Sequence, residues 1–219
     1  MINIELFLSA FAIFFVVIDP PGCAPIFASL TTGASHVQRR AMALRAVIVS
    51  AIILLIFGLF GQQLLAALHI ELDSFRIAGG IMLFIIAIEM VFEKRTARRE
   101  ERAQKIIDQQ EDDQPEIEDV SIFPMAMPMM AGPGSIASIM LLMSQNEGME
   151  SAAIIFGAVA AVLILTFFAL WAAGPVMRLL GDKVEAVVTR LLGVLLAALA
   201  AQFIIDGLRG SFGLAGIVS

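Results

Sequence analysis

The feature that most constrains the fold of this 219-residue chain is a series of six long apolar stretches. A helix of about 20 apolar residues is long enough to cross the hydrocarbon core of a bilayer. In this chain 59% of the residues are hydrophobic and 16% are charged, whereas a soluble domain has about 45–50% and about 25%. We therefore predict an all-α membrane protein with six transmembrane spans, approximately over residues 6–30, 43–68, 75–92, 122–143, 152–173 and 186–205.

Charged residues gather between the third and the fourth span. There a basic stretch is followed by an acidic one, a pattern typical of a solvated loop. The chain is therefore predicted to consist of a first half over residues 1–92, a charged loop over residues 93–120 and a second half over residues 121–219. Each half contains three spans, and the two halves form one membrane domain.

The basic residues predict the orientation of the spans, because Lys and Arg remain on the cytoplasmic side of a membrane. The side reached after the first, third and fifth spans carries most of them: Arg39, Arg40, Arg45, Lys94, Arg95, Arg98, Arg99, Arg102, Lys105, Arg178, Lys183 and Arg190. The other side has Arg76 and Arg209. We therefore expect a plasma-membrane protein with both termini outside and the loop 93–120 in the cytoplasm.

Two short motifs occur once in each half, in the same order. Pro21-Gly22-Cys23 corresponds to Pro133-Gly134-Ser135, 112 residues later, and Arg76-Ile-Ala-Gly79 corresponds to Arg190-Leu-Leu-Gly193, 114 residues later. Because each half crosses the membrane three times, the second half begins on the opposite side from the first. The second copy would therefore have the inverted topology. Inverted repeats with paired interrupted helices are typical of secondary transporters. The sequence therefore predicts two inverted three-helix repeats.

Proline and glycine interrupt the first span of each repeat. Pro20, Pro21, Gly22 and Pro25 are expected to unwind the first span near the middle of the membrane, and the stretch 131–135 is expected to do the same to the fourth. Unwound backbone must face protein or water, since its polar groups find no partner in lipid. Helix ends offer N–H donors to an anion and carbonyl acceptors to a cation, which suits a small zwitterion. An alternative interpretation is that Pro and Gly only kink two helices for packing.

The predicted substrate-binding residues are those of the two interruptions: Asp19, Pro20, Pro21, Gly22, Cys23, Gly132, Pro133, Gly134 and Ser135. Among them Asp19 has two interpretations of equal weight. A carboxylate inside the membrane indicates a functional site, where it would accept a hydrogen bond from a substrate ammonium or carry a coupling proton. Alternatively, Asp before Pro-Pro is a good N-cap for the next half-helix.

Three further polar residues are candidates for gating or substrate contact: Arg76, Arg190 and Gln202. The two arginines are expected each to start a helix about one turn from the membrane interface, where snorkelling or pairing is the simpler role. Gln202 is expected to hydrogen-bond to another helix.

Several other classes of site have no support in the sequence. Cys23 is the single cysteine, and His36 and His69 lie far apart, so neither an intrachain disulfide nor a zinc site is expected. No nucleophile–base set and no glycine-rich nucleotide motif occurs. We expect no enzymatic activity, no cofactor, no metal and no nucleic-acid partner.

Motifs from nearly the whole chain resemble the MarC family. They are Ile18-Asp-Pro-Pro-Gly-Cys-Ala-Pro-Ile-Phe27, Phe75-Arg-Ile-Ala-Gly-Gly-Ile81, Pro124-Met-Ala-Met-Pro128 with Ala131-Gly-Pro-Gly-Ser-Ile-Ala137, and Arg190-Leu-Leu-Gly193 with Gln202-Phe-Ile-Ile-Asp-Gly207. The resemblance implies a six-span bacterial or archaeal protein with inverted repeats. Because some members are neutral amino acid transporters, including the SnatA type, it also implies substrates such as glycine, alanine or serine. Asp19 and Asp206 depart from the Asn of other members, although Asp also occurs at the first position.

Together these observations predict a secondary transporter that binds a small neutral amino acid at the two interruptions. It would move this substrate across the membrane by alternating access. A proton or a sodium ion is the candidate coupling ion, and the lipid bilayer is the expected environment. Two alternatives remain open: an exporter of another small metabolite or drug-like solute, and a channel-like or regulatory membrane protein.

Overall fold

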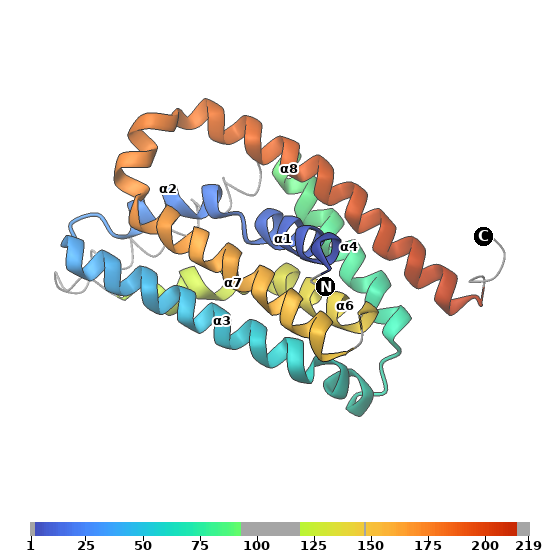
Figure 1. The fold of residues 1–219 in the computed structure, drawn as a ribbon. Helices are drawn as coiled ribbons and strands as arrows, with labels where there is room; N and C mark the ends of the chain where they lie inside the picture. Colours follow the sequence, from blue (N-terminus) through green and yellow to red (C-terminus); the bar gives the residue numbers. More distant parts are fainter. Residues whose placement is uncertain (1–2, 93–118, 147, 214–219) are drawn as a thin grey trace.

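The computed structural model describes residues 3–92, 119–146 and 148–213, with the backbone alone for 173–186 and 188, and all regular secondary structure in these ranges is helical (Figure 1). Residues 93–118, most of the predicted charged loop, lie outside this description. The elements are α1 (Ile4–Ile18), α2 (Pro20–Leu30), α3 (His36–Ala67), α4 (Leu72–Val91), η1 (Ser121–Met130), α6 (Pro133–Gln145), α7 (Met149–Trp171) and α8 (Ala173–Ser211).

Among the described residues, five helical segments are long and apolar enough to cross a membrane: Ile4–Leu30, His36–Ala67, Leu72–Val91, Met149–Trp171 and Thr189–Ser211. A sixth candidate is the pair of η1 and α6, which are bent by 52° relative to each other. The predicted all-α membrane fold is therefore confirmed, and the six predicted spans correspond to these five segments and the bent pair of η1 and α6. The large apolar side chains that α3 leaves exposed suit contact with lipid: Leu44, Ile48, Ile52, Leu55, Ile56, Leu59, Phe60 and Leu64.

Two helices extend beyond the spans predicted from the apolar pattern. α3 begins at His36, where Ser35 and Gln38 form a capping box, so its first turns carry the basic residues of the predicted inner side. α8 begins at Ala173, directly after α7, although its membrane-crossing part begins at Thr189. The start of α3 is rich in residues with good intrinsic helix propensity, such as Gln38, Arg39 and Ala41, so this helix continues beyond the apolar pattern. The first part of α8 is helical although it contains Gly174, Pro175 and Gly181, whose propensities disfavour a helix.

Each broken span packs mainly on helices of the other half of the chain. α1 and α2 contact α7, whereas η1 and α6 contact α3. In the same way α2 contacts α8 and α6 contacts α4. The most extensive contact is between α4 and α8, which run side by side in Figure 1. The packing partners of the two halves are therefore reciprocal.

Glycine allows α4 and α8 to approach closely. A Cβ atom on Gly80 would lie 2.9 Å from the carbonyl oxygen of Ala200, and one on Gly193 would lie 2.9 Å from the Cβ of Met90. Because Gly80 precedes Met90 whereas Ala200 follows Gly193, the two helices are antiparallel. Small residues at such contacts are the usual means of tight helix packing in membranes.

The first broken span lies at the centre of the protein. In its most apolar 18-residue stretch 56% is buried, compared with 28% in α3, in α4 and in Thr189–Ser211. Phe14, Ile18, Cys23 and Phe27 are almost completely buried. The interruption of this span is therefore surrounded by protein rather than by lipid.

Candidate functional site

The first interruption consists of one residue. Asp19 has φ 59° and ψ 66°, a left-handed conformation, and it is both the C-cap of α1 and the N-cap of α2. Pro20 and Pro21, which we expected to be unwound, form the first turn of α2. Proline fits there because the first N–H groups of a helix have no intrahelical partner. Gly22 and Pro25 are also helical, so the predicted length of this break was wrong.

The carboxylate of Asp19 turns back onto the helix that follows it. Its Oδ1 accepts a hydrogen bond from the N–H of Gly22 at 3.1 Å, and the residue is 2% exposed. A Cβ on Gly22 would lie 2.3 Å from Oδ2, so a side chain at this position would displace the carboxylate. The predicted capping role of Asp19 is confirmed.

The second interruption lies at Ala131 and Gly132, between η1 and α6. η1 is irregular: Phe123 and Met127 have extended backbone angles inside it, and each precedes a proline, which disfavours a helical conformation for the preceding residue. Gly132 is the N-cap of α6, and no side chain caps this helix. A Cβ on Gly132 would lie 2.1 Å from the carbonyl oxygen of Pro128, so the close approach of the backbone requires glycine.

One hydrogen bond is common to both interruptions. The thiol of Cys23 donates to the carbonyl of Ile18 at 3.3 Å, and the hydroxyl of Ser135 donates to the carbonyl of Met130 at 2.7 Å. In each case a side chain in the second half-helix reaches back to the last residue of the first. Ile18 and Met130 are 112 residues apart, as are Cys23 and Ser135, so the local geometry repeats with the spacing of the motifs.

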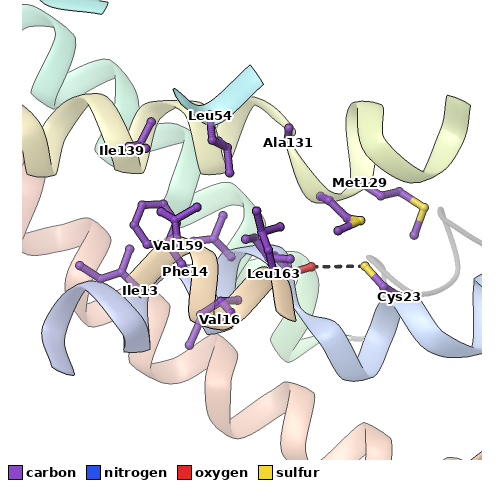
Figure 2. Packing of buried hydrophobic residues seen from close by; sticks show 14 of the residues in the cluster. Ile13, Phe14, Val16, Cys23, Leu54, Met129, Ala131, Ile139, Val159 and Leu163 are labelled. Atoms are coloured by element: carbon purple, nitrogen blue, oxygen red, sulfur yellow. Dashed lines mark hydrogen bonds between the residues drawn. The ribbon is translucent and has the colours of Figure 1, made fainter. Parts of the chain in front are cut away.

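The structure brings the two interruptions together. A Cβ on Gly134 would lie 3.1 Å from Cγ1 of Val17, two residues before Asp19, and 2.7 Å from Cδ1 of Ile86 on α4. In Figure 2 Ala131 marks the joint between η1 and α6, and the dashed line marks the hydrogen bond of Cys23. The predicted site residues are buried except for two prolines, Pro21, which is half-buried, and Pro133, which is exposed.

Two of the three predicted gating residues, Arg76 and Gln202, bond within their own helices. Arg76 lies in the second turn of α4, where its Nη1 is 2.8 Å from Oδ1 of Asp73. The amide of Gln202 donates to Oδ1 of Asp206 at 2.9 Å within α8, and not to another helix as we expected. Arg190 is exposed and lies in the middle of α8 rather than at its start, although it is close to the start of the membrane-crossing part.

Ser138, which lies on α6 four residues after Gly134, is not among the residues predicted from the sequence. Its side chain is fully buried, and its hydroxyl has no hydrogen-bond partner in the part of the chain that the structure describes. The signal in the sequence is a polar residue inside an apolar helix, one turn after a glycine. A buried hydroxyl without a partner is uncommon and calls for an explanation.

An ion pair fixes the start of the second broken span. Arg45 of α3 pairs with Asp119, whose Oδ1 also accepts from the N–H of Ser121 at 3.0 Å. Partial burial acts to raise the pKa of Asp119, but the hydrogen bonds from Ser121 and the charge of Arg45 outweigh burial, so that this pKa is below its usual value. The side chains are 64% and 43% exposed, so the pair is a surface contact.

Comparison with known proteins shows similarity along almost the whole chain. Residues 4–212 match the model of the family described as "MarC family integral membrane protein". UPF0056 membrane protein MJ1677 of Methanocaldococcus jannaschii is 33% identical over 209 residues, which cover 95% of this chain and 98% of that protein. UPF0056 membrane protein YvbG of Bacillus subtilis is 34% identical, with 95% of each chain covered. UPF0056 inner membrane protein YhgN of Escherichia coli is 31% identical, with 92% and 95% covered. No solved structure matches the chain.

Proposed function

We propose that this chain, which belongs to the MarC family of integral membrane proteins, is a secondary transporter of small neutral amino acids such as glycine, alanine and serine. The substrate binds near the middle of the membrane at the two helix interruptions. Access to this site alternates between the two sides of the bilayer. The chain has no enzymatic activity of its own in this proposal.

The observation that carries the proposal is the meeting of two buried interruptions, one of which holds a carboxylate. Asp19 is almost completely buried, and intramembrane ionisable residues are expensive and usually functional. Its Oδ1 caps α2, and a carboxylate has further lone pairs that can accept a hydrogen bond from a substrate ammonium. The small residues Gly22, Cys23, Gly134 and Ser135 suit a substrate of a few heavy atoms.

Reciprocal packing supports the inverted three-helix repeats on which alternating access would depend. Exchange of the two halves converts the contact of α1 and α2 with α7 into that of η1 and α6 with α3. It also converts the contact between α2 and α8 into that between α6 and α4. The matched hydrogen bonds of Cys23 and Ser135 follow the same exchange. Transporters with this symmetry bind their substrates between the repeats.

The distribution of basic residues supports an inner-membrane orientation with both termini outside and residues 93–120 in the cytoplasm. Figure 1 places the start of α3 and the first part of α8 at one end of the molecule, and the start of α4 and the end of α8 at the other. The first end carries most of the Lys and Arg of these helices, as the positive-inside rule requires for a cytoplasmic face. YhgN of Escherichia coli, a relative, is named an inner membrane protein.

Counterflow in proteoliposomes tests this function. The purified chain is reconstituted with unlabelled alanine inside, and the entry of labelled alanine or glycine is measured with and without a proton or sodium gradient. We expect saturable accumulation that requires internal substrate, and the gradient that increases it identifies the coupling ion. Flux that does not saturate would favour a channel, and competition only by unrelated solutes would favour an exporter of another metabolite.

A further inference from the structure

The last helices of the two halves make the most extensive contact between helices in the described part of the chain. They are α4 and the membrane-crossing part of α8 (Thr189–Ser211), and together we call them the α4–α8 arm. Toward one end of the contact, a Cβ on Gly193 would lie 3.1 Å from the carbonyl oxygen of Ala87. Toward the other end, a Cβ on Gly207 would lie 2.8 Å from the carbonyl oxygen of Asp73. Because backbones this close lose packing along the whole contact when they part, the two helices form one rigid body.

Hydrogen bonds tie the second half of each broken span to α3, outside the arm. Nε and Nη2 of Arg39, at the start of α3, donate to the carbonyl of Thr31, the C-cap of α2, at 3.1 and 2.9 Å. Nε2 of Gln62, near the end of α3, donates to the carbonyl of Met143 on α6 at 3.2 Å. A charged donor makes a stronger bond than a neutral one, so the tie to α2 is the stronger. α2 and α6 are therefore held by α3 when the arm moves.

The arm meets α6 through apolar contacts. A Cβ on Gly79 of α4 would lie 3.5 Å from the Cβ of Ala137 and 3.1 Å from Cδ1 of Leu141. Cδ1 of Ile86, also on α4, would lie 2.7 Å from a Cβ on Gly134. Apolar contacts are non-directional, so these surfaces can part and meet again more easily than the hydrogen-bonded ends of α2 and α6 can leave α3. Since Gly134 belongs to the second interruption, their parting uncovers the candidate site.

The contacts of the arm with the two broken spans lie toward opposite sides of the membrane. α8 contacts α2, and α4 contacts α6. In Figure 1 α2 lies toward the end of the molecule where α3 starts, and α6 lies toward the opposite end, where α4 starts. A rigid body that crosses the membrane cannot tilt away from both ends at once. Both contacts are formed in this structure, which therefore corresponds to a closed state.

We propose that the α4–α8 arm is the gate of the candidate site and tilts as one rigid body. When α4 leaves α6 the site opens to the outside, and when α8 leaves α2 it opens to the cytoplasm. This inference rests on the proposed function and deepens it, because it names the part of the chain that controls access. The moving body consists of one helix from each half, instead of one whole half that rocks against the other. Rotation of a rigid body about an interface is a common way to switch between two packed states.

Two engineered disulfides test the arm in the counterflow assay. Gly79→Cys with Ala137→Cys joins α4 to α6 across a Cβ–Cβ distance of 3.5 Å. Met90→Cys with Gly193→Cys joins α4 to α8 across 2.9 Å, slightly closer than the usual range of about 3.5–4.5 Å, so this bond needs a small shift of the helices. Cys23 stays in place, because it is completely buried. Each protein in its reduced form is the control for its own substitutions.

The two disulfides should have opposite effects. Oxidation of the first pair should lower the rate of alanine counterflow about tenfold or more, and reduction should restore it, because a locked gate stops the conformational cycle. Oxidation of the second pair should change the rate less than about twofold, because the arm moves as one body. Full counterflow with the first pair oxidised would overturn the proposal. A block by the second pair that reduction relieves would also overturn it, since α4 and α8 would then have to separate.

Thiol labelling of the single variant Ala137→Cys detects the movement without transport. Ala137 is 4% exposed, so a charged, membrane-impermeant thiol reagent added outside right-side-out vesicles reaches this position only when α4 leaves α6. The wild type, with Cys23 alone, measures the background. We expect labelling of the variant to exceed this background and to increase with time.

The labelling also separates failure of the gate from failure of the proposed function. Labelling above background without any amino acid counterflow would support the gate and overturn amino acid transport. Counterflow without labelling above background would overturn the gate while the transporter remains. If neither is observed, both proposals are overturned.

Discussion

The two interruptions occupy corresponding positions but are built in opposite ways. The first is a single left-handed residue between two regular helices, and Ile4–Leu30 still qualifies as one span. The second follows an irregular segment, and its two parts are bent by 52°. In the first a buried carboxylate caps the second half-helix, whereas in the second the cap is backbone alone. The repeated motif therefore fixes where each helix breaks, whereas the residues beside it determine which groups the break offers to a ligand.

Glycine substitution should affect the second interruption more than the first. Gly132→Ala places a Cβ against a backbone carbonyl that cannot rotate away, and we expect a loss of about 2–4 kcal/mol of unfolding free energy. Gly22→Ala displaces only the side chain of Asp19, with an expected loss of about 1–2 kcal/mol. Denaturation in mixed micelles measures both. Gly157→Ala is the control, because nothing lies within 4 Å of its Cβ. A larger loss for Gly22→Ala would contradict the comparison.

Two substitutions of Asp19 separate its charge from its cap. Asn caps a helix about as well as Asp, so Asp19→Asn should keep its stability within about 0.5 kcal/mol of wild type, whereas Asp19→Ala should lose about 1 kcal/mol. Both should reduce counterflow at least tenfold, since the acceptor for the substrate ammonium loses its charge.

Counterflow of Asp19→Asn across a pH series also tests whether Asp19 carries a coupling proton. If it does, the variant should lose the pH dependence of the wild type. An unchanged pH dependence would assign coupling to another group.

The shared hydrogen bonds should differ in strength. The hydroxyl of Ser135 is a better donor than the thiol of Cys23, and its bond is shorter, at 2.7 Å against 3.3 Å. We expect Ser135→Ala to lose about 1–2 kcal/mol of unfolding free energy and Cys23→Ala less than about 1 kcal/mol. Cys23→Ser, which gives the first interruption the donor of the second, should be neutral or stabilising. Equal losses for the two alanine variants would show that these bonds do not distinguish the interruptions.

The smallest effect is expected at the pair of Arg45 and Asp119, which holds the second broken span to α3. The pKa of Asp119 is lowered in the folded protein. The contribution of this carboxylate to the free energy of unfolding is therefore fully present above the unfolded pKa, and it is lost as the pH falls through the folded pKa. Both side chains are well exposed, so Asp119→Asn should cost less than about 0.5 kcal/mol at neutral pH. Stability curves of variant and wild type should converge at low pH; curves that stay apart would contradict this.

Most of the fold was predictable from hydrophobic pattern and turn chemistry. Apolar stretches of membrane-spanning length predicted the spans, and the motifs around Pro21 and Pro133 located both interruptions. The ends of α3 and α8 were not predictable from this pattern. α3 begins in polar residues with good helix propensity, and the first part of α8 is helical although it contains Gly174, Pro175 and Gly181. The sequence left two equal interpretations of Asp19, because a carboxylate before two prolines can either cap the following helix or contact a ligand.

The sequence by itself determined that the chain enters a membrane and that its first and fourth spans are interrupted, because these properties depend on local composition and on the restriction that proline places on the residue before it. Only the tertiary structure decided that the interruptions meet and that Ser138 is buried with no hydrogen-bond partner among the described residues. It also decided that Arg76 and Gln202 bond within their own helices. Such facts depend on contacts between residues far apart in the chain, such as Gly134 and Val17, and local pattern does not specify which faces of different helices pack together.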